Sequence, residues 1–246
     1  MKSFLDFLML AAVKIVSQFM FRFRGERVDL IHQDGWSRVR LLVLLNHTSL
    51  YEPVLAGFAP YPLLWRFAYH GVLPVAEKTM RRNIGLFFRF LARNVVVVTR
   101  QRDETWDDVL NRIDRNAIVM ILPEGRMMRR SGLDAAGKEM TVRGGVADIL
   151  DVLDSGVMLM VYSGGLHHIQ APGELLPRPF KTIRARVELI EIADYKRTLG
   201  HDRGMDAFKP AVIDDLTARR DRLCPVAENG SVRGGEVPKW RGWPYN

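Results

Sequence analysis

The sequence predicts an α/β fold, with a single mostly parallel or mixed sheet flanked by helices and preceded by an N-terminal membrane-associated helix. Two observations predict the sheet: apolar runs of strand length recur along the chain, and helical patterns of about ten to fifteen residues separate them. A third predicts the first helix, because large apolar residues crowd the first twenty or so positions. A chain of 246 residues, 48% of them hydrophobic, can bury the core of one domain.

The composition narrows the class of partner. A formal net charge of +8 favours anionic partners, such as nucleic acid, anionic lipid or phosphorylated small molecules. The arginines are scattered and form no known nucleic-acid-binding motif, so we expect no nucleic acid partner. The one cysteine, Cys224, offers neither a disulfide nor a structural metal site, which favours a reducing compartment. We expect no metal and no cofactor.

Residues 1–24 are expected to form an amphipathic helix on a membrane surface. The apolar segment is interrupted by Asp6, Lys14, Ser17 and Gln18. No run therefore reaches the ~18 apolar residues of a spanning helix, and no small-residue cleavage site follows. Cations that could meet anionic lipid stand at Lys2, Lys14, Arg22 and Arg24. The alternative is a helix packed on the protein's own core.

Residues 25–204 carry the pattern of a single α/β domain. Apolar or β-branched runs predict buried strands at residues 38–46, 62–70, 95–99, 117–122 and 157–162. Helices are predicted at residues 53–59, 81–94, 103–114 and 146–154, with Pro53 well placed as a first helical residue. Residues 182–192 alternate and predict an edge or antiparallel strand. Residues 205–246 are expected to form a helix, up to about residue 222, and a loosely ordered tail.

Polar residues follow three of the predicted strands. The candidates are Asn46, His47 and Glu52 after the first strand, Arg100 after the third, and Glu124, Gly125 and Arg126 after the fourth. In open α/β sheets, ligands bind at the carboxyl ends of the strands. A histidine base, a carboxylate to orient it and nearby guanidinium groups suit acyl transfer to a hydroxyl of a phosphorylated acceptor.

These segments also carry a family resemblance. The stretches NHTSLYE, VVVVTR and LPEGRMMRR resemble, in order and spacing, the first three motifs of the glycerolipid (lysophospholipid) acyltransferase family of the 1-acylglycerol-3-phosphate acyltransferase type. The resemblance covers about residues 25–170, including TVRGGVADIL after the third motif. It implies that the domain at residues 25–204 moves a fatty acyl chain from acyl-CoA or acyl-carrier protein to the hydroxyl of a lysophospholipid such as 1-acylglycerol-3-phosphate. It also implies a peripheral or monotopic protein of membrane lipid synthesis, at the cytoplasmic face.

The resemblance implies a role for each matched residue. His47 would take the proton of the acceptor hydroxyl as that hydroxyl attacks the thioester, and Glu52 would fix the imidazole tautomer and stabilise the imidazolium. The substrate-binding positions would be Asn46, Arg100, Glu124, Gly125 and Arg126. Gly125 would allow close backbone approach, and the two arginines would hold phosphate.

Two departures from the family pattern keep alternatives open. Glu52 stands where the family has aspartate, and Arg126-Met127 stands where the family has Thr-Arg. The first departure leaves a simpler interpretation in which Glu52 is only the polar turn that starts a helix, although glutamate is a poor N-cap. Together they leave a second alternative, a catalytically silent lipid-binding or scaffold homologue of the same fold.

Overall fold

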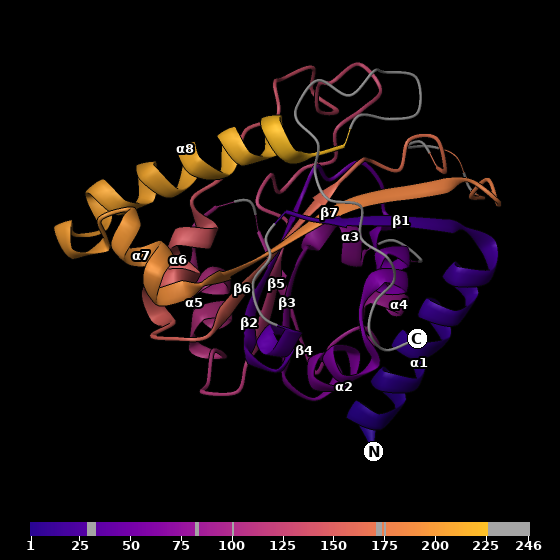
Figure 1. The fold of residues 1–246 in the computed structure, drawn as a ribbon, viewed down its shortest axis with the longest axis horizontal. Helices are drawn as coiled ribbons and strands as arrows, with labels where there is room; N and C mark the ends of the chain where they lie inside the picture. The colour runs from indigo at the N-terminus through magenta and orange to yellow at the C-terminus, as the bar shows by residue number, and fades with distance from the viewer. Residues whose placement is uncertain (29–32, 82–83, 100, 171–173, 175, 226–246) are drawn as a thin grey trace.

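A mixed sheet forms the centre of the protein in the computed structural model, which describes residues 1–28, 33–81, 84–99, 101–170, 174 and 176–225 (Figure 1). Within these residues the sheet has seven strands in the order β1-β7-β6-β2-β5-β3-β4. The strands are β1 (Arg22–Arg27), β2 (Val39–Leu45), β3 (Gly71–Ala76), β4 (Asn94–Val98), β5 (Ile118–Ile121), β6 (Val157–Ser163) and β7 (Thr182–Glu191). The strand β2 lies near the middle of the sheet, where both of its faces are covered.

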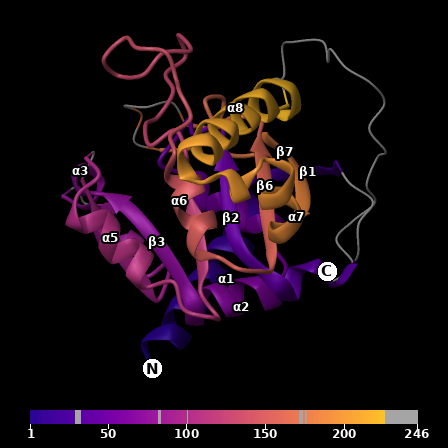
Figure 2. The same ribbon diagram turned by 90° about the vertical axis from the view of Figure 1, so that its left-hand side faces the viewer.

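Helices cover both faces of the sheet (Figures 1 and 2). One face carries α1 (Lys2–Met20), α2 (Tyr61–His70), α3 (Glu77–Met80) and α4 (Ile84–Phe88). The other carries α5 (Glu104–Asn111), α6 (Gly145–Val152), α7 (Ile192–Thr198) and α8 (Met205–Leu223). The short 3-10 helices are η1 (Gln33–Arg38), η2 (Glu52–Phe58) and η3 (His201–Arg203). The predicted fold class, a single mixed sheet flanked by helices and preceded by an apolar helix, is confirmed.

The strand directions place the candidate residues together. β2 pairs parallel with β5 and with β6, so the carboxyl ends of these central strands lie at one edge. β7 pairs antiparallel with β6, which confirms the antiparallel alternative for residues 182–192. The edge alternative is wrong, because β1 pairs with the other side of β7. Figure 2 shows the long segment between β5 and α6 projecting beyond the sheet at the carboxyl edge.

Most predicted elements are present, but residues 62–70 were assigned wrongly, β3 was not predicted and one helix is shorter than expected. Residues 62–70 form α2 instead of a strand, with Leu63, Leu64, Phe67 and Ala68 buried at helical spacing. The neighbouring strand is β3, which the sequence analysis missed because Pro74 interrupts its apolar run. β3 pairs with β5 only at Gly71 and Val72, and Pro74 lies opposite Val96 of the edge strand β4. The helix expected over residues 81–94 is shorter, since α4 ends at Phe88.

The N-terminal helix ends earlier than expected, and its polar side is buried. α1 ends at Met20, and the expected boundary at residue 24 falls inside β1. By length and composition α1 is apolar enough to cross a membrane, with a mean hydropathy of 1.5. Its polar side chains, however, face the protein: Asp6, Lys14 and Ser17 are buried. The expectation that Lys14 meets lipid is therefore wrong, since it is 4% exposed.

A network of charged side chains holds α8 against the sheet. Arg219 on α8 donates to Glu188 on β7 at 2.7 Å and to Asp215, one turn earlier, at 2.7 Å. Two tyrosines complete the network: Tyr162 donates to Glu188 at 2.5 Å and Tyr195 to Asp215 at 2.7 Å. Burial raises the pKa of both phenols, so both hydroxyls keep their protons. One guanidinium therefore links α8 to β7, in addition to the apolar contacts of Phe208, Val212 and Leu216 with the core. The tail at residues 234–246 lies outside the described residues.

Replacing Arg219 with leucine should destabilise the fold. The change leaves Glu188 and Asp215 partly buried without their cation, which should cost roughly 2 kcal/mol, less than the loss of a fully buried pair because all three groups keep some exposure. Urea unfolding measures this directly. Arg222→Leu, an exposed position on the same helix, is the control and should change the free energy of unfolding little. Equal effects of the two substitutions would contradict the role of the network.

Candidate active site

The turn after β2 has an unusual backbone conformation. Asn46 has a φ of +71°, in the left-handed region that non-glycine residues rarely adopt. Two hydrogen bonds hold it there: the Asn46 N–H donates to Glu124 Oε1 at 2.7 Å, and its side-chain amide donates to the Ser163 carbonyl at 2.8 Å. Asn46 thereby joins the ends of β2, β5 and β6. The next residue, His47, emerges from this junction, and its carbonyl accepts the N–H of Met128 at 2.8 Å.

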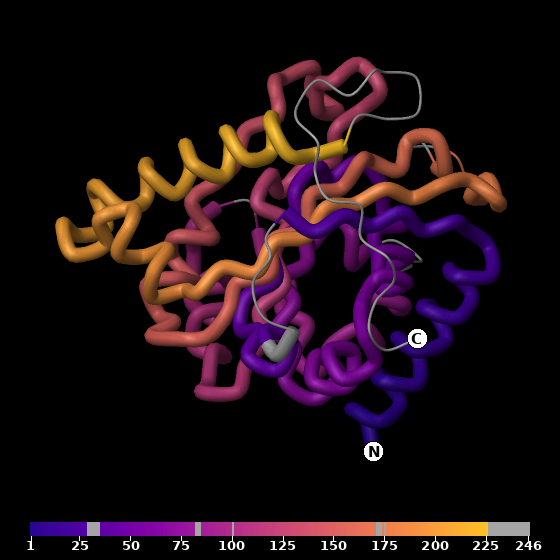
Figure 3. Tube along the Cα trace, in the orientation of Figure 1, coloured from indigo at the N-terminus to yellow at the C-terminus, as the bar shows by residue number. Residues whose placement is uncertain are grey.

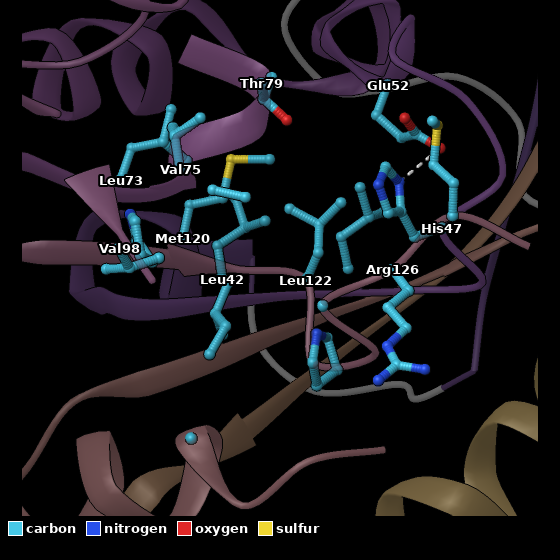
Figure 4. Close-up of a pocket in the computed structure, with 18 of the residues that line it drawn as sticks. Leu42, His47, Glu52, Leu73, Val75, Thr79, Val98, Met120, Leu122 and Arg126 are labelled. Carbon is cyan, nitrogen blue, oxygen red and sulfur yellow. Dashed lines mark ion pairs between the residues drawn. The ribbon is translucent and has the colours of Figure 1, made fainter. Parts of the chain in front are cut away.

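His47 and Glu52 meet across this turn. His47 Nδ1 lies 3.1 Å from Glu52 Oε1, with the two side chains 16% and 4% exposed (Figure 4). The ring is within hydrogen-bonding distance but is not well aligned with the carboxylate. Such misalignment is common in catalytic pairs and tightens in the substrate complex. The pairing occupies Nδ1 and leaves Nε2 for a proton transfer.

The carboxylate of Glu52 also closes the turn. Its Oε1 accepts the backbone N–H groups of Thr48 at 2.9 Å and Ser49 at 2.8 Å. Glu52 is the first residue of η2, and the N-cap position, Tyr51, makes no side-chain capping bond. Glu52 therefore turns back onto the His47 loop instead of capping its own helix. The one extra methylene, compared with aspartate, gives the carboxylate the reach to contact the loop and the imidazole together.

The electrostatic environment favours a protonated imidazole. Burial is the largest influence on His47 and lowers its pKa, but the charge and hydrogen bonding of Glu52 and the charge of Glu124 together outweigh it. The pKa of His47 is therefore raised above the ordinary value. A neighbouring carboxylate that stabilises the imidazolium makes the neutral ring a stronger base.

Glu124 is buried next to the turn that carries His47 and accepts the N–H of Asn46. It is 2% exposed, and burial raises the pKa of its carboxyl group, although the Asn46 N–H opposes this. Neither Glu124 nor Asn46 lines the large cavity, whereas Gly125 and Arg126 do. The structure thus gives Glu124 and Asn46 contacts within the turn, and their predicted role in binding substrate stays a prediction.

Arg126 lies beside His47 at the cavity wall (Figure 4). Its guanidinium forms an ion pair with Asp134, whose pKa is held at about 2, chiefly by the N–H of Lys138 and also by Arg126. Gly125, with a φ of +60°, carries no side chain where the Arg143 side chain passes, 3.5 Å from its ideal Cβ position. The guanidinium groups of Arg126 and Arg143 therefore both approach this loop.

The second motif, VVVVTR at residues 95–100, is described only up to Thr99. Arg100 lies outside the described residues. The nearby Arg102 pairs with Asp148 at 3.2 Å, and Lys209 pairs with the same carboxylate at 2.9 Å. Among the described residues, no group of three or more histidine, cysteine or acidic side chains could hold a metal ion.

A large apolar cavity of about 1110 Å³ reaches the His47–Glu52 pair. It extends between the sheet and the helices α1 and α2, and Leu10 on α1 and Leu64 on α2 line it. Figure 4 shows Leu42, Leu73, Val75, Val98, Met120 and Leu122 around this space. A cavity with this lining and volume suits a long hydrocarbon chain, with the imidazole placed where the chain's polar end would lie.

A comparison with solved structures found a protein of similar fold, whereas two sequence comparisons found no match. No family model matches the chain, and no curated protein matches it by sequence. One solved structure with a similar fold is that of the 1-acyl-sn-glycerophosphate (LPA) acyltransferase PlsC from Thermotoga maritima. The two share 16% identity with a TM-score of 0.51, over 85% of this chain and 80% of PlsC. At this identity the likeness establishes the fold alone.

Two further residues in this region were not predicted from the sequence. Arg143 lines the cavity and passes over Gly125; its signal was the basic residue followed by glycine in TVRGG. Asp134, eight residues further along the chain, pairs with Arg126, and no sequence motif predicted this pair. The pair forms because the segment after β5 folds back on itself, which a short-range pattern does not reveal.

Glu52→Gln should reduce turnover by about 100-fold, because the amide keeps the acceptor for Thr48 and Ser49 but loses the charge that stabilises the imidazolium. With neutral His47 acting as the base, wild-type kcat/KM should fall as the pH drops through the raised His47 pKa. In Glu52→Gln this acid limb should move to lower pH, because the raising influence is gone. Steady-state rates between pH 5 and 9 measure both.

The shorter Glu52→Asp provides a second test of the same pair. The carboxylate then has to reach both the loop and His47 from one methylene further back, so activity between those of wild type and Glu52→Gln is expected. Thermal unfolding is the accompanying measurement. Full activity in Glu52→Gln together with higher stability in Glu52→Asp would show that Glu52 only forms the turn.

Proposed function

We propose that this protein is an O-acyltransferase that moves a fatty acyl chain from acyl-CoA or acyl-carrier protein to the hydroxyl of a lysophospholipid such as 1-acylglycerol-3-phosphate. The observation that carries the proposal is the His47–Glu52 pair, 3.1 Å apart, at one end of an apolar cavity of about 1110 Å³. The fold shared with PlsC supports it.

The chemistry follows from the pair. His47 Nε2 accepts the proton of the acceptor hydroxyl as that oxygen attacks the thioester carbonyl. Glu52 keeps the other ring nitrogen protonated and stabilises the imidazolium that forms. Collapse of the tetrahedral intermediate breaks the carbon–sulfur bond, and the departing thiolate takes the proton from His47. These steps need no nucleophile from the protein and no acyl-enzyme intermediate.

The positions of the arginines favour an anionic acceptor. Arg126 and Arg143 both lie on the cavity wall, Arg126 beside His47 and Arg143 beside Gly125, and guanidinium groups bind phosphate in a bidentate manner. The ion pair of Arg126 with Asp134 reduces what Arg126 alone can contribute. In the proposal Arg100, from the second motif, is a further phosphate ligand.

The exposed side of α1 supports a monotopic protein at the cytoplasmic face of a membrane. Large apolar side chains face outward at Phe4, Leu5, Leu8, Ile15, Val16 and Phe19. Trp65 on the neighbouring α2 is also 43% exposed, and Arg22 and Arg24 follow at the end of the helix. An apolar helix face with adjacent cations binds at the headgroup boundary, with anionic lipid as partner.

The second candidate is a lipid-binding homologue without catalysis. The ion pair that occupies Arg126 and the glutamate in place of aspartate favour it. The buried His47–Glu52 contact argues against it, because a site without catalysis has no need to bury an ionisable pair beside an apolar cavity.

His47→Gln should abolish acyl transfer while leaving the fold intact. General-base catalysis contributes about 100- to 10,000-fold, so the residual rate should lie near the lower limit of detection. The assay uses full-length protein, 1-acylglycerol-3-phosphate and other lysophospholipids, and both acyl-CoA and acyl-carrier protein donors. If wild type binds lysophospholipid but transfers no acyl chain from either donor, the non-catalytic candidate replaces the enzyme.

The double substitution Leu8→Gln and Phe19→Gln should release the protein from vesicles that contain anionic phospholipid. Both side chains are exposed, at 46% and 82%, so the fold should not depend on them. High salt alone should not release the wild type, because apolar burial dominates the binding. Vesicle sedimentation measures this, and unchanged sedimentation of the folded variant would exclude α1 as the anchor.

A further inference from the structure

Two side chains of α1 meet on a single backbone oxygen of η2. Lys14 Nζ donates to the Gly57 carbonyl at 3.1 Å, and Gln18 Nε2 donates to the same oxygen at 3.0 Å. Gly57 lies in the last turn of η2, where the carbonyl groups lack partners within the helix. η2 packs against α1, which the trace of Figure 3 shows at the N-terminal, indigo end of the chain. The bonds therefore fix the carboxyl end of η2 to one position along α1.

Attaching a helix through a buried lysine costs free energy, because the ammonium group loses its hydration. Lys14 is 4% exposed, and burial lowers the pKa of its ammonium group. Its nearest aromatic contact is the Tyr61 ring, with Nζ 5.2 Å from the centroid. An apolar side chain of similar volume would commonly be neutral or stabilising at such a position, and buried charges are best attested as devices that fix register. Lys14 therefore determines where α1 sits more than how strongly it packs.

The helix that Lys14 holds is the one that carries Glu52. η2 begins at Glu52 and reaches Gly57 five residues later, about 10 Å away at ~2 Å per residue. Its carboxyl end has little freedom on the other side, since a Cβ at Gly57 would lie 2.3 Å from the Phe23 ring of β1. A displacement of this end would thus be transmitted along a short rigid helix to the Glu52 carboxylate.

We propose that Lys14, with Gln18, is a positioning residue that holds η2 in the register at which Glu52 meets His47. This inference rests on the proposed function, in which α1 is embedded at the surface of the bilayer. Lipid attracts the apolar side of α1 and would draw the helix away from the domain. The polar stripe formed by Asp6, Lys14 and Ser17 opposes that movement, because these groups have no partners in the acyl region.

The test compares two matched sets of variants. Lys14→Met with Gln18→Met keeps the length of both side chains and removes both bonds to Gly57. Arg66→Met is the control: Arg66 on α2 covers the same face, and it donates to the carbonyls of Trp36 in η1 and Val39 in β2, at 3.1 and 3.2 Å. Vesicle binding and thermal unfolding are recorded for both.

The α1 variant should lose about 10-fold in kcat, a part of the full contribution of the base, with little change in the acceptor KM and with vesicle binding retained. Its acid limb should move to lower pH, since Glu52 holds the imidazolium less well while Glu124 and Arg126, which face His47 from the segment after β5, are unchanged. In a Glu52→Gln background the α1 substitutions should cause no further loss. Arg66→Met should stay within twofold of wild type in kcat.

Two results would overturn the proposal. One is additive loss in the Glu52→Gln background, which would mean that Lys14 acts by another route. The other is an unchanged acid limb, or a loss equal to that of Arg66→Met, which would make the contact general packing. The His47 pKa followed by NMR of labelled histidine supplies a readout that needs no turnover. A lower pKa in the α1 variant supports the positioning role even if wild type proves inactive, an outcome that would refute only the proposed function.

Discussion

The contact between His47 and Glu52 is the constraint on which the rest of the site depends. Both groups are largely buried, so each needs the other and the backbone donors around it. Four residues lie between them, and the Glu52 carboxylate closes this loop by accepting the N–H groups of Thr48 and Ser49. One carboxylate therefore fixes the local backbone and the tautomer of the imidazole. The carboxylate of an aspartate is one methylene shorter, so it would have to reach the backbone N–H groups and the imidazole from a different backbone position.

The surrounding fold supplies the supports for this contact from three directions. The sheet brings the ends of β2, β5 and β6 together, and Asn46 joins them through Glu124 and Ser163. The segment after β5 adds a bond from Met128 to the His47 carbonyl. α1 holds η2 from the side of the cavity through Gly57. A long apolar space lies beneath the imidazole because α1 and α2 cover the sheet without filling it.

The sequence predicted the parts of the fold that short-range patterns encode. The runs that became β2, β5 and β6 are buried on both faces and therefore continuous, and α8 has the length and composition of a helix. The pairing of His47 with Glu52 followed from their spacing after a strand. The patterns failed where tertiary context decides: Pro74 disguised β3, and Lys14 looked like a lipid-facing cation although its partner is 43 residues away in the chain. The Arg126–Asp134 pair depends on a fold-back of the same kind.

The central claim is that the imidazole of His47 is the base whose protonation limits acyl transfer. The most direct measurement is the pKa of His47 by NMR of histidine-labelled protein, compared with the pKa of the acid limb of kcat/KM on the same preparation. The account predicts that the two values coincide and lie above the ordinary histidine value of about 6.5. A His47 pKa below that value, or an acid limb that does not follow it, would contradict the account.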